Sequence, residues 1–152
     1  MKISFIGHSH VVDHENVKIL VKEQIRLNIG ADDKVVCYLG GYGDFDMLCA
    51  CACRELKREY MGIELVYVTP YLDVSSQLKI RDMITGGLYD SSVYPPIERT
   101  PLRYAISKRN NWMMENADVI IAYVHLGFGG AFKTVEFAKR RKKKIINVCD
   151  LM

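Results

Sequence analysis

The chain has 152 residues, of which 49% are hydrophobic and 26% charged, and its formal net charge is +3. This is the length of one ordinary domain, and the composition excludes a mainly disordered chain. No apolar run approaches the roughly 20 residues of a membrane span, and the first seven residues have the pattern of a strand, not of a signal peptide. We therefore expect one domain over residues 1–152, a cytoplasmic location and no membrane partner.

The five cysteines, at positions 37, 49, 51, 53 and 149, are an odd number without a secretory signal, which favours free thiols in a reducing compartment. On a helix only Cys49 and Cys53 would share a face, so buried small side chains are the simpler interpretation and a zinc site is the alternative. The histidines at positions 8, 10 and 14 span a strand end, a turn and a helix start, so their convergence on a metal is not expected. We predict neither a metal nor a cofactor.

The first half of the chain alternates between apolar runs and helical patterns. Residues 2–7 are a breaker-free apolar run, typical of a buried strand, and helical spacing of apolar residues predicts a helix over 15–29. A second buried strand over 34–39 leads into Gly40-Gly41-Tyr42-Gly43. Asp44 is a candidate N-cap for a helix over 44–60, and residues 63–68 form a third strand.

The second half begins with a long segment that has no clean period. Residues 71–97 contain scattered glycine, proline and serine, and we expect an excursion that acts as a lid or binding loop, with one short helix over 77–84. Pro101 suits the first turn of a helix over 101–116. A fourth strand over 119–124, a helix over 130–141 and a fifth strand over 145–148 complete the chain.

These elements predict an α/β fold: a Rossmann-like, doubly wound, mainly parallel sheet of five strands with helices on both faces. The strands are continuous apolar runs, which is typical of a sheet covered on both faces. Ligands of such sheets bind at the carboxyl ends of the strands. Three strand ends carry unusual residues, namely Gly7-His8-Ser9, Gly40-Gly41-Tyr42-Gly43 and the glycine-rich turn over 127–130.

The two glycine-rich turns favour an anionic ligand. Glycine lets a ligand approach the main chain, and the helix that follows offers free N–H groups and the positive end of its dipole. Neither turn is a P-loop or a complete G-x-G-x-x-G motif. Two helix ends supply at most about 4 kcal/mol, whereas micromolar binding needs about 8, so contacts with a base and a ribose must supply the rest.

The C-terminal half resembles the LOG family of cytokinin-nucleotide phosphoribohydrolases. The resemblance lies in Arg109-Asn110-Asn111-Trp112-Met113, in the strand over 117–122, and in Gly129-Gly130 with Thr134 and Glu136. The whole chain is similar to a small bacterial branch of the wider SLOG superfamily, named for the DNA-processing protein DprA (Smf) and LOG. This resemblance implies a Rossmann-like sheet and a nucleotide-type ligand. Some SLOG domains sense NAD-derived cyclic ADP-ribose signals, and others cleave an N-glycosidic bond.

The resemblance implies a role for each matching position. Arg109 would orient a nucleotide, Gly129 and Gly130 would hold a phosphate, and Glu136 would act near a ribose. In contrast to the family pattern, Phe128 replaces a proline, Phe132 a third glycine, and Thr134 stands one position later. Lys133 adds a cation where the phosphate is expected. These departures bear on hydrolysis more than on binding. Arg109 and Glu136 are therefore catalytic candidates only if the protein is an enzyme.

The expected ligand-binding set combines the three strand ends with the family positions: Gly7, His8, Ser9, Gly40, Gly41, Tyr42, Gly43, Arg109, Gly129, Gly130, Lys133, Thr134 and Glu136. We predict a sensor or binding module for a nucleotide or an ADP-ribose-like molecule, assembled as a dimer or a higher homo-oligomer. A nucleoside 5′-monophosphate N-glycosidase is the first alternative. A DNA-processing accessory protein that uses the cations at 140–144 is the second, and nucleic-acid binding is not expected, because one basic run at a helix end also complements the helix dipole.

Overall fold

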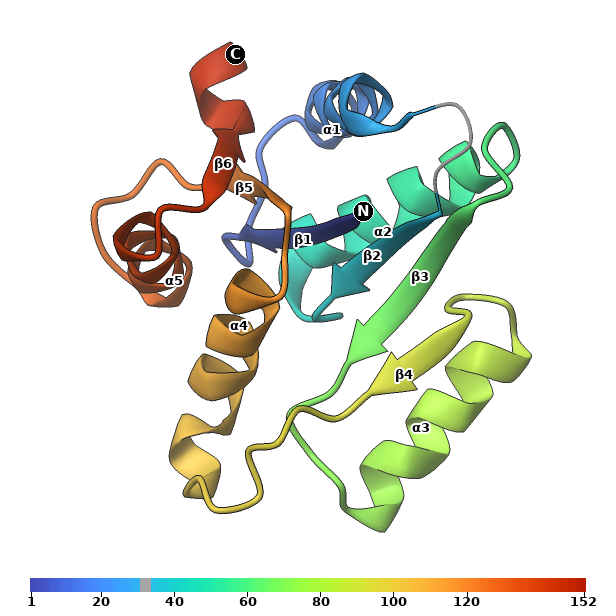
Figure 1. Cartoon of the computed structure of the whole chain (residues 1–152), viewed down its shortest axis with the longest axis vertical. Coiled ribbons are helices and arrows are strands. Elements are labelled where there is room, and N and C mark those ends of the chain that lie inside the picture. Colours follow the sequence, from blue (N-terminus) through green and yellow to red (C-terminus); the bar gives the residue numbers. More distant parts are fainter. Residues whose placement is uncertain (31–33) are drawn as a thin grey trace.

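The computed structural model describes residues 1–30 and 34–152 (Figure 1). The strands are β1 (Lys2–Gly7), β2 (Val35–Leu39), β3 (Ile63–Val68), β4 (Ser91–Val93), β5 (Val119–Tyr123) and β6 (Lys144–Asn147). The α-helices are α1 (His14–Asn28), α2 (Gly43–Lys57), α3 (Val74–Thr85), α4 (Ala105–Glu115) and α5 (Gly130–Arg140). Short 3₁₀ helices cover Leu102–Tyr104 and Val148–Leu151.

The strands form one parallel sheet in the order β4-β3-β2-β1-β5-β6. The chain winds outward from β1 to β4 and then returns to the centre to place β5 beside β1. Because parallel crossovers are right-handed, this reversal puts the later helices on the opposite face. Helices α1, α2 and α3 pack on one face and α4 and α5 on the other, as Figure 1 shows. The predicted doubly wound Rossmann-like α/β fold is confirmed.

Each face of the sheet has its own core, as alternation along β1 illustrates. Phe5 belongs to the core beneath α1 and α2, and Ile6 to the core beneath α4 and α5. Ser4 is fully buried between the layers, and its hydroxyl donates to the Met113 carbonyl oxygen at 2.7 Å. The one polar residue inside this strand is therefore paired, which removes the cost of burying it.

The segment over 71–97 differs most from the prediction. It contains a 12-residue helix, α3, and a sixth strand, β4, which pairs with β3 at the edge of the sheet. The Asp73 side chain caps α3 by accepting from the Ser76 N–H, and Ile80 is the buried residue of this helix. The short helix expected over 77–84 is thus present and extends further at both ends, whereas a strand of three residues gives no periodic signal in the sequence.

The remaining differences are small and concern element ends. Helix α2 starts at Gly43, so Asp44 lies in its first turn and is not the N-cap. The Asp44 carboxylate instead accepts from the Val11 N–H at 3.0 Å, which holds the loop after β1 against α2. The predicted strand over 145–148 is Lys144–Asn147, and Val148 begins the 3₁₀ helix. None of the helices in the described ranges combines the length and the apolar character that a membrane crossing requires.

Candidate functional site

A cavity lies where the sheet reverses its winding direction, between the carboxyl ends of β1 and β5. This is the position at which open α/β sheets bind ligands. The cavity, here named the switch-point cavity, has a volume of about 440 Å³. Its walls come from the loop after β1, the loop after β5, the start of α5 and one side of α4. The lining residues are Ile6, Gly7, His8, Ser9, His10, Tyr42, Asp46, Ile106, Arg109, Asn110, His125, Leu126, Phe128, Gly129, Gly130 and Ala131.

His8 connects the two loops at this cavity. Its Nε2 accepts from the backbone N–H of His125 at 3.1 Å and of Leu126 at 3.2 Å, so Nε2 is the unprotonated nitrogen of a neutral ring. The ring also meets His125 and Tyr123 edge-on. Burial, with the His125 charge second, lowers the pKa of His8 below 6.5. His8 therefore sets the shape of the β5 loop as a neutral acceptor.

The start of α5 faces the same cavity with open backbone groups. The N-cap is Gly129, and no side chain caps the helix. Gly129 has φ 94°, a conformation that favours glycine. A methyl group added at Gly127, Gly129 or Gly130 would find no atom within 4 Å. The first N–H groups of α5, with the positive end of its dipole, thus border open space that an anion can occupy.

The first glycine-rich turn is different, because packing fills the space around it. A methyl group at Gly41 (φ 66°) would lie 2.1 Å from Cε2 of Tyr67, and one at Gly43 (φ 86°) would lie 2.7 Å from Cα of Ser9. These two glycines are required for the turn and for close packing. The glycines at 40–43 thus have a structural explanation that the glycines at 127–130 lack.

Arg109 is the buried cation of the site. It rises from α4 with 3% of its surface exposed, and its Nη1 donates to the carbonyl oxygens of Gly40 at 3.1 Å and Val68 at 2.6 Å. Its Nε donates to Asn110 Oδ1 at 2.9 Å. Burial is the main cause that lowers the pKa of Arg109 below its ordinary value. The side chain is therefore locked in place while its charge is poorly hydrated, which favours an anionic partner.

One nitrogen of Arg109 is left for a ligand. Nη2 makes no hydrogen bond within residues 1–30 and 34–152. Nη2 is also not fully buried. Among the described residues, the one fully buried side-chain nitrogen or oxygen without a hydrogen bond is Glu55 Oε2, which lies 3.3 Å from Lys22 Nζ. Arg109 lines the switch-point cavity, so Nη2 has access to it or to the neighbouring cavity that this residue also borders.

Asp46 is the buried acid beside Arg109, and the sequence analysis missed it. Its Oδ2 accepts from the Tyr42 N–H at 3.1 Å and would lie 3.0 Å from a methyl group at Gly40, which in turn would lie 3.2 Å from Cζ of Arg109. Burial raises the pKa of Asp46 to about 6. The Tyr42 hydrogen bond and the Arg109 charge both lower the pKa, but the effect of burial is larger. An acidic residue on the apolar face of α2, next to Phe45 and Leu48, was the signal available in the sequence.

The structure divides the predicted site residues into three groups. Lining the switch-point cavity are Gly7, His8, Ser9, Tyr42, Arg109, Gly129 and Gly130. Gly40 and Gly41 line the neighbouring cavity. Gly43, Lys133, Thr134 and Glu136 line neither one.

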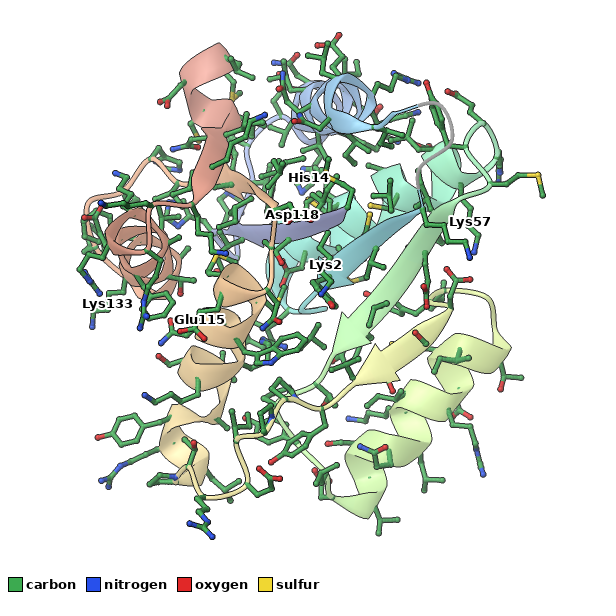
Figure 2. The ribbon with its side chains drawn as sticks, in the orientation of Figure 1. Lys2, His14, Lys57, Glu115, Asp118 and Lys133 are labelled. Atoms are coloured by element: carbon green, nitrogen blue, oxygen red, sulfur yellow. The ribbon has the colours of Figure 1, made fainter. Side chains whose placement is uncertain are left out.

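The α5 residues outside the cavities have other contacts. Thr134 is buried and its hydroxyl donates to the Gly130 carbonyl oxygen at 2.9 Å. Glu136 pairs with Lys139 at 3.1 Å, one turn along the same helix. Lys133 is exposed on the outer side of α5, as Figure 2 shows.

The histidines and the basic run are tied to the protein itself. His10 and His14 lie 3.6 Å and 3.3 Å from Asp44 Oδ2, and within the described ranges no group of three or more His, Cys, Asp or Glu side chains is arranged to hold a metal ion. In the basic run, Arg141 pairs with Glu115, whereas Lys143 donates to the Glu115 and Ala117 carbonyl oxygens and Lys144 to Asn28. Three of these five cations therefore hold the end of α5 and the start of β6 to neighbouring elements.

Comparison with known proteins identifies the fold. No protein-family model and no curated protein sequence matches the chain. Among solved structures it is similar to the DNA processing protein A (DprA) of Streptococcus pneumoniae, with a TM-score of 0.62 and 16% identity over 95% of this chain and 48% of that one. It is also similar to DprA of Helicobacter pylori, which is described for its single-stranded DNA binding mode. The TM-score is 0.61 and the identity 15%, over 95% of this chain and 63% of that one. A structural-genomics target, TM1055, is similar with a TM-score of 0.58 and 16% identity, over 95% of this chain and 71% of that one.

These neighbours confirm the predicted Rossmann-like fold and show that it is similar to the fold of DprA. Identities of 15–16% establish the fold alone. The chain spans about half the length of the pneumococcal protein, so the activity of that whole protein does not transfer with the fold.

Proposed function

We propose that this protein binds a nucleotide or nucleotide-derived small molecule in the switch-point cavity, with a phosphate at the start of α5. The observation that carries the proposal is the placement of an uncapped helix start and a locked, nearly buried Arg109 around one cavity at the switch point of the sheet. Both features favour negative charge, and although Asp46 lies beside Arg109, no carboxylate of the described residues forms an ion pair with Arg109. The exposed ring of Tyr42 at the cavity edge is available to a base.

Binding without cleavage, as in a sensor, is the better supported form of this function. Glycosidic hydrolysis needs a carboxylate that positions water or stabilises charge at the ribose. Glu136, the candidate from the family resemblance, pairs with Lys139 and does not line the cavity. Asp46 does line it; its Oδ2 accepts from the Tyr42 N–H, and its Oδ1 makes no hydrogen bond in the described residues, so Asp46 is the carboxylate that a hydrolase would have to use. The N-glycosidase is therefore the alternative that the assay below has to exclude.

Single-stranded DNA binding is a second candidate because the described Helicobacter neighbour binds such DNA. Against it, three cations of the run at 140–144 are engaged in contacts within the protein. A DNA-binding groove predicts an affinity that falls steeply with salt, by roughly one power of the salt concentration for each phosphate contacted. Titration of a fluorescent oligonucleotide at several salt concentrations tests this, and absent or salt-insensitive binding rejects it.

A homo-oligomer is part of the proposal. Large apolar side chains are exposed near the cavity mouth, among them Tyr42, Ile106 and Phe128, the last with 68% of its surface accessible. Such residues are enriched at protein interfaces. Sedimentation velocity over a range of protein concentrations measures the oligomeric state, and a monomer at every concentration contradicts this part.

A negative charge introduced at the start of α5 tests the main proposal. In the variant Gly130→Asp the new side chain finds open space, and a carboxylate in the first turn stabilises a helix by about 0.3–1 kcal/mol, so the fold is retained. The same carboxylate repels a phosphate, and we expect nucleotide affinity to fall at least about tenfold. Gly127→Asp is the matched control, since it adds the same charge to the same loop outside the cavity lining.

The assay is a thermal-shift and calorimetric screen of mononucleotides, NAD, ADP-ribose and cyclic ADP-ribose isomers, with the nucleosides as phosphate-free controls. At 100 times its Kd a ligand adds about 2.7 kcal/mol of stability, a shift of several degrees for this size. Mass spectrometry of each mixture then separates an intact ligand from a released base. Equal affinities of Gly130→Asp and Gly127→Asp, or equal affinities of nucleotide and nucleoside, contradict the proposed phosphate site.

A further inference from the structure

A second cavity lies between α2 and α3 and is larger than the first. Its volume is about 580 Å³, within the range of sites for small organic ligands. It exists because α3 stands away from the sheet: Ile80 is the buried residue of this helix, and β4 beneath it has three residues. We name it the α2–α3 cavity. It shares Tyr42, Ile106 and Arg109 with the switch-point cavity and has its own floor and far wall.

The floor of the α2–α3 cavity is aromatic. Tyr67 from β3 and Tyr89 from the loop before β4 meet edge-on, with ring centroids 5.2 Å apart. Met47 and Met83 stand on the helices to either side, and a flexible thioether packs well against flat rings. Gly41 is the residue that lets the Tyr67 ring lie over the first glycine-rich turn. The lining is thus shaped for a flat, apolar ring.

Two phenol hydroxyls at this floor have no protein partner. Tyr89 is 5% exposed, and neither its hydroxyl nor that of Tyr67 makes a hydrogen bond within residues 1–30 and 34–152. Buried tyrosine hydroxyls in proteins are normally hydrogen-bonded. Neither oxygen is sealed in the protein, since Glu55 Oε2 is the one fully buried atom without a bond in that range. Both hydroxyls are therefore unpaired in the described residues; Tyr67 and Tyr89 line the α2–α3 cavity, and Tyr89 also borders a smaller cavity beside Asp90.

The charged side chains that line the cavity are cations, whereas the buried Asp46 behind the lining interacts electrostatically with Tyr67, Tyr89 and Arg109. Arg54 from α2, Lys79 from α3 and Arg109 from α4 line it, and no aspartate or glutamate does. Arg54 donates to the Leu88 carbonyl oxygen at 3.3 Å, which fixes it at the wall, whereas Lys79 is exposed at the mouth and makes no ion pair in the described residues. Arg54 and Lys79, together with the two unpaired hydroxyl donors, favour an anion in this cavity, while Arg109 is shared with the switch-point cavity.

We propose that the α2–α3 cavity is a second binding site, which takes a small aromatic anion: a flat ring that carries a carboxylate, a sulfonate or a phosphate. The ring packs over Tyr67 between Met47 and Met83. The anionic group accepts from the tyrosine hydroxyls and is attracted by Lys79 and Arg54. This site is separate from the phosphate position at the start of α5, so it stands or falls independently of the function proposed above.

The probe is 1-naphthoate, compared with its uncharged analogue 1-naphthylmethanol, and binding to the full chain is measured by titration calorimetry and ligand-observed NMR. We expect naphthoate to bind at least about tenfold more tightly than the alcohol, because the charge and its hydrogen bonds are the selected features. Equal affinity of the two probes, or no binding of naphthoate at about 1 mM, overturns the proposal.

Three variants locate the probe. Lys79→Glu reverses a charge at the mouth, and Arg81→Glu is its matched control, exposed on the same helix but outside the lining. We expect naphthoate affinity to fall about tenfold in the first and to stay unchanged in the second. Tyr89→Phe keeps the ring and removes one free hydroxyl, and we expect several-fold weaker binding. Circular dichroism checks that each variant is folded.

The variant Gly130→Asp separates the two sites. If naphthoate binds in the α2–α3 cavity, this change at the start of α5 leaves its affinity unchanged. Loss of naphthoate binding in Gly130→Asp, with no effect of Lys79→Glu, would place the probe in the switch-point cavity and refute the second site. Loss of nucleotide binding alone leaves the second site intact.

Discussion

Asp46 makes the stability of the protein depend on pH in an unusual direction. Its pKa is raised from 3.8 to about 6 in the folded chain, chiefly by burial. The folded state therefore holds a proton that the unfolded state has already lost between these two values. Stability rises with pH only where the unfolded state binds more protons. Here the contribution of Asp46 must fall as the pH rises from about 4 to about 6.

The size of this effect follows from the same two values. A tenfold difference in proton affinity is worth about 1.4 kcal/mol, so the interval from 3.8 to about 6 corresponds to a loss of about 3 kcal/mol above pH 6. With 8% of its surface exposed, Asp46 has little solvent screening to reduce this figure. It is a large fraction of the 5–15 kcal/mol by which domains are typically stable.

The test compares the wild type with Asp46→Asn, which keeps an oxygen for the Tyr42 N–H but cannot ionise. Urea denaturation at several pH values between about 4 and 8 gives the free energy of unfolding of each protein. Other titrating groups are common to both and cancel in the difference. We expect wild-type stability relative to the variant to fall by about 3 kcal/mol across this range. A difference that is flat, or that rises with pH, refutes the assignment of a buried, high-pKa acid at Asp46.

Three further outcomes test the contacts around the cavities. Gly41→Ala should cost about 1–3 kcal/mol of unfolding free energy in denaturant titrations, because φ 66° is unfavourable and the methyl group meets the Tyr67 ring; a cost equal to that of Gly127→Ala contradicts this. Protonation of His8, whose pKa is lowered, should free the Leu126 N–H as the pH falls through a value below 6.5, seen by NMR as a lower protection factor of that amide relative to its intrinsic exchange rate at each pH; an unchanged protection factor opposes it. Arg109→Met should destabilise by about 1.5–3 kcal/mol through two lost carbonyl bonds, and a neutral effect would exclude that bracing role.

The sheet and most helices could be predicted because their residues carry periodic burial. The apolar runs of β1, β2, β3 and β5 are covered on both faces, and their length of five or six residues favours a strand over a buried helix. The helix expected over 77–84 is present within the longer α3, but the strand β4 escaped prediction. This strand is Ser91-Ser92-Val93, so tertiary pairing with β3 and not local pattern determines it.

The candidate site shows the same limit. Sequence pattern singled out the strand ends, and seven of the predicted residues line the switch-point cavity. It did not distinguish glycines that pack, such as Gly41 beside Tyr67, from glycines that border open space, such as Gly129. It also missed Asp46, and it missed the α2–α3 cavity altogether, because a helix that stands off a sheet leaves no trace in the order of residues.

The weak attachment of α3 also has a consequence for motion. This helix buries Ile80, packs Met83 and Ile84 partly against the core, and is followed by an edge strand of three residues. Elements with few buried apolar contacts open without global unfolding, and we expect local opening of α3 on that side of the α2–α3 cavity. Its occupant can enter and leave through local opening of α3, while the sheet centre and the bonds of Arg109 stay intact. We expect amide exchange to be faster along α3 than along α2, and to become slower along α3 when a ligand occupies the cavity.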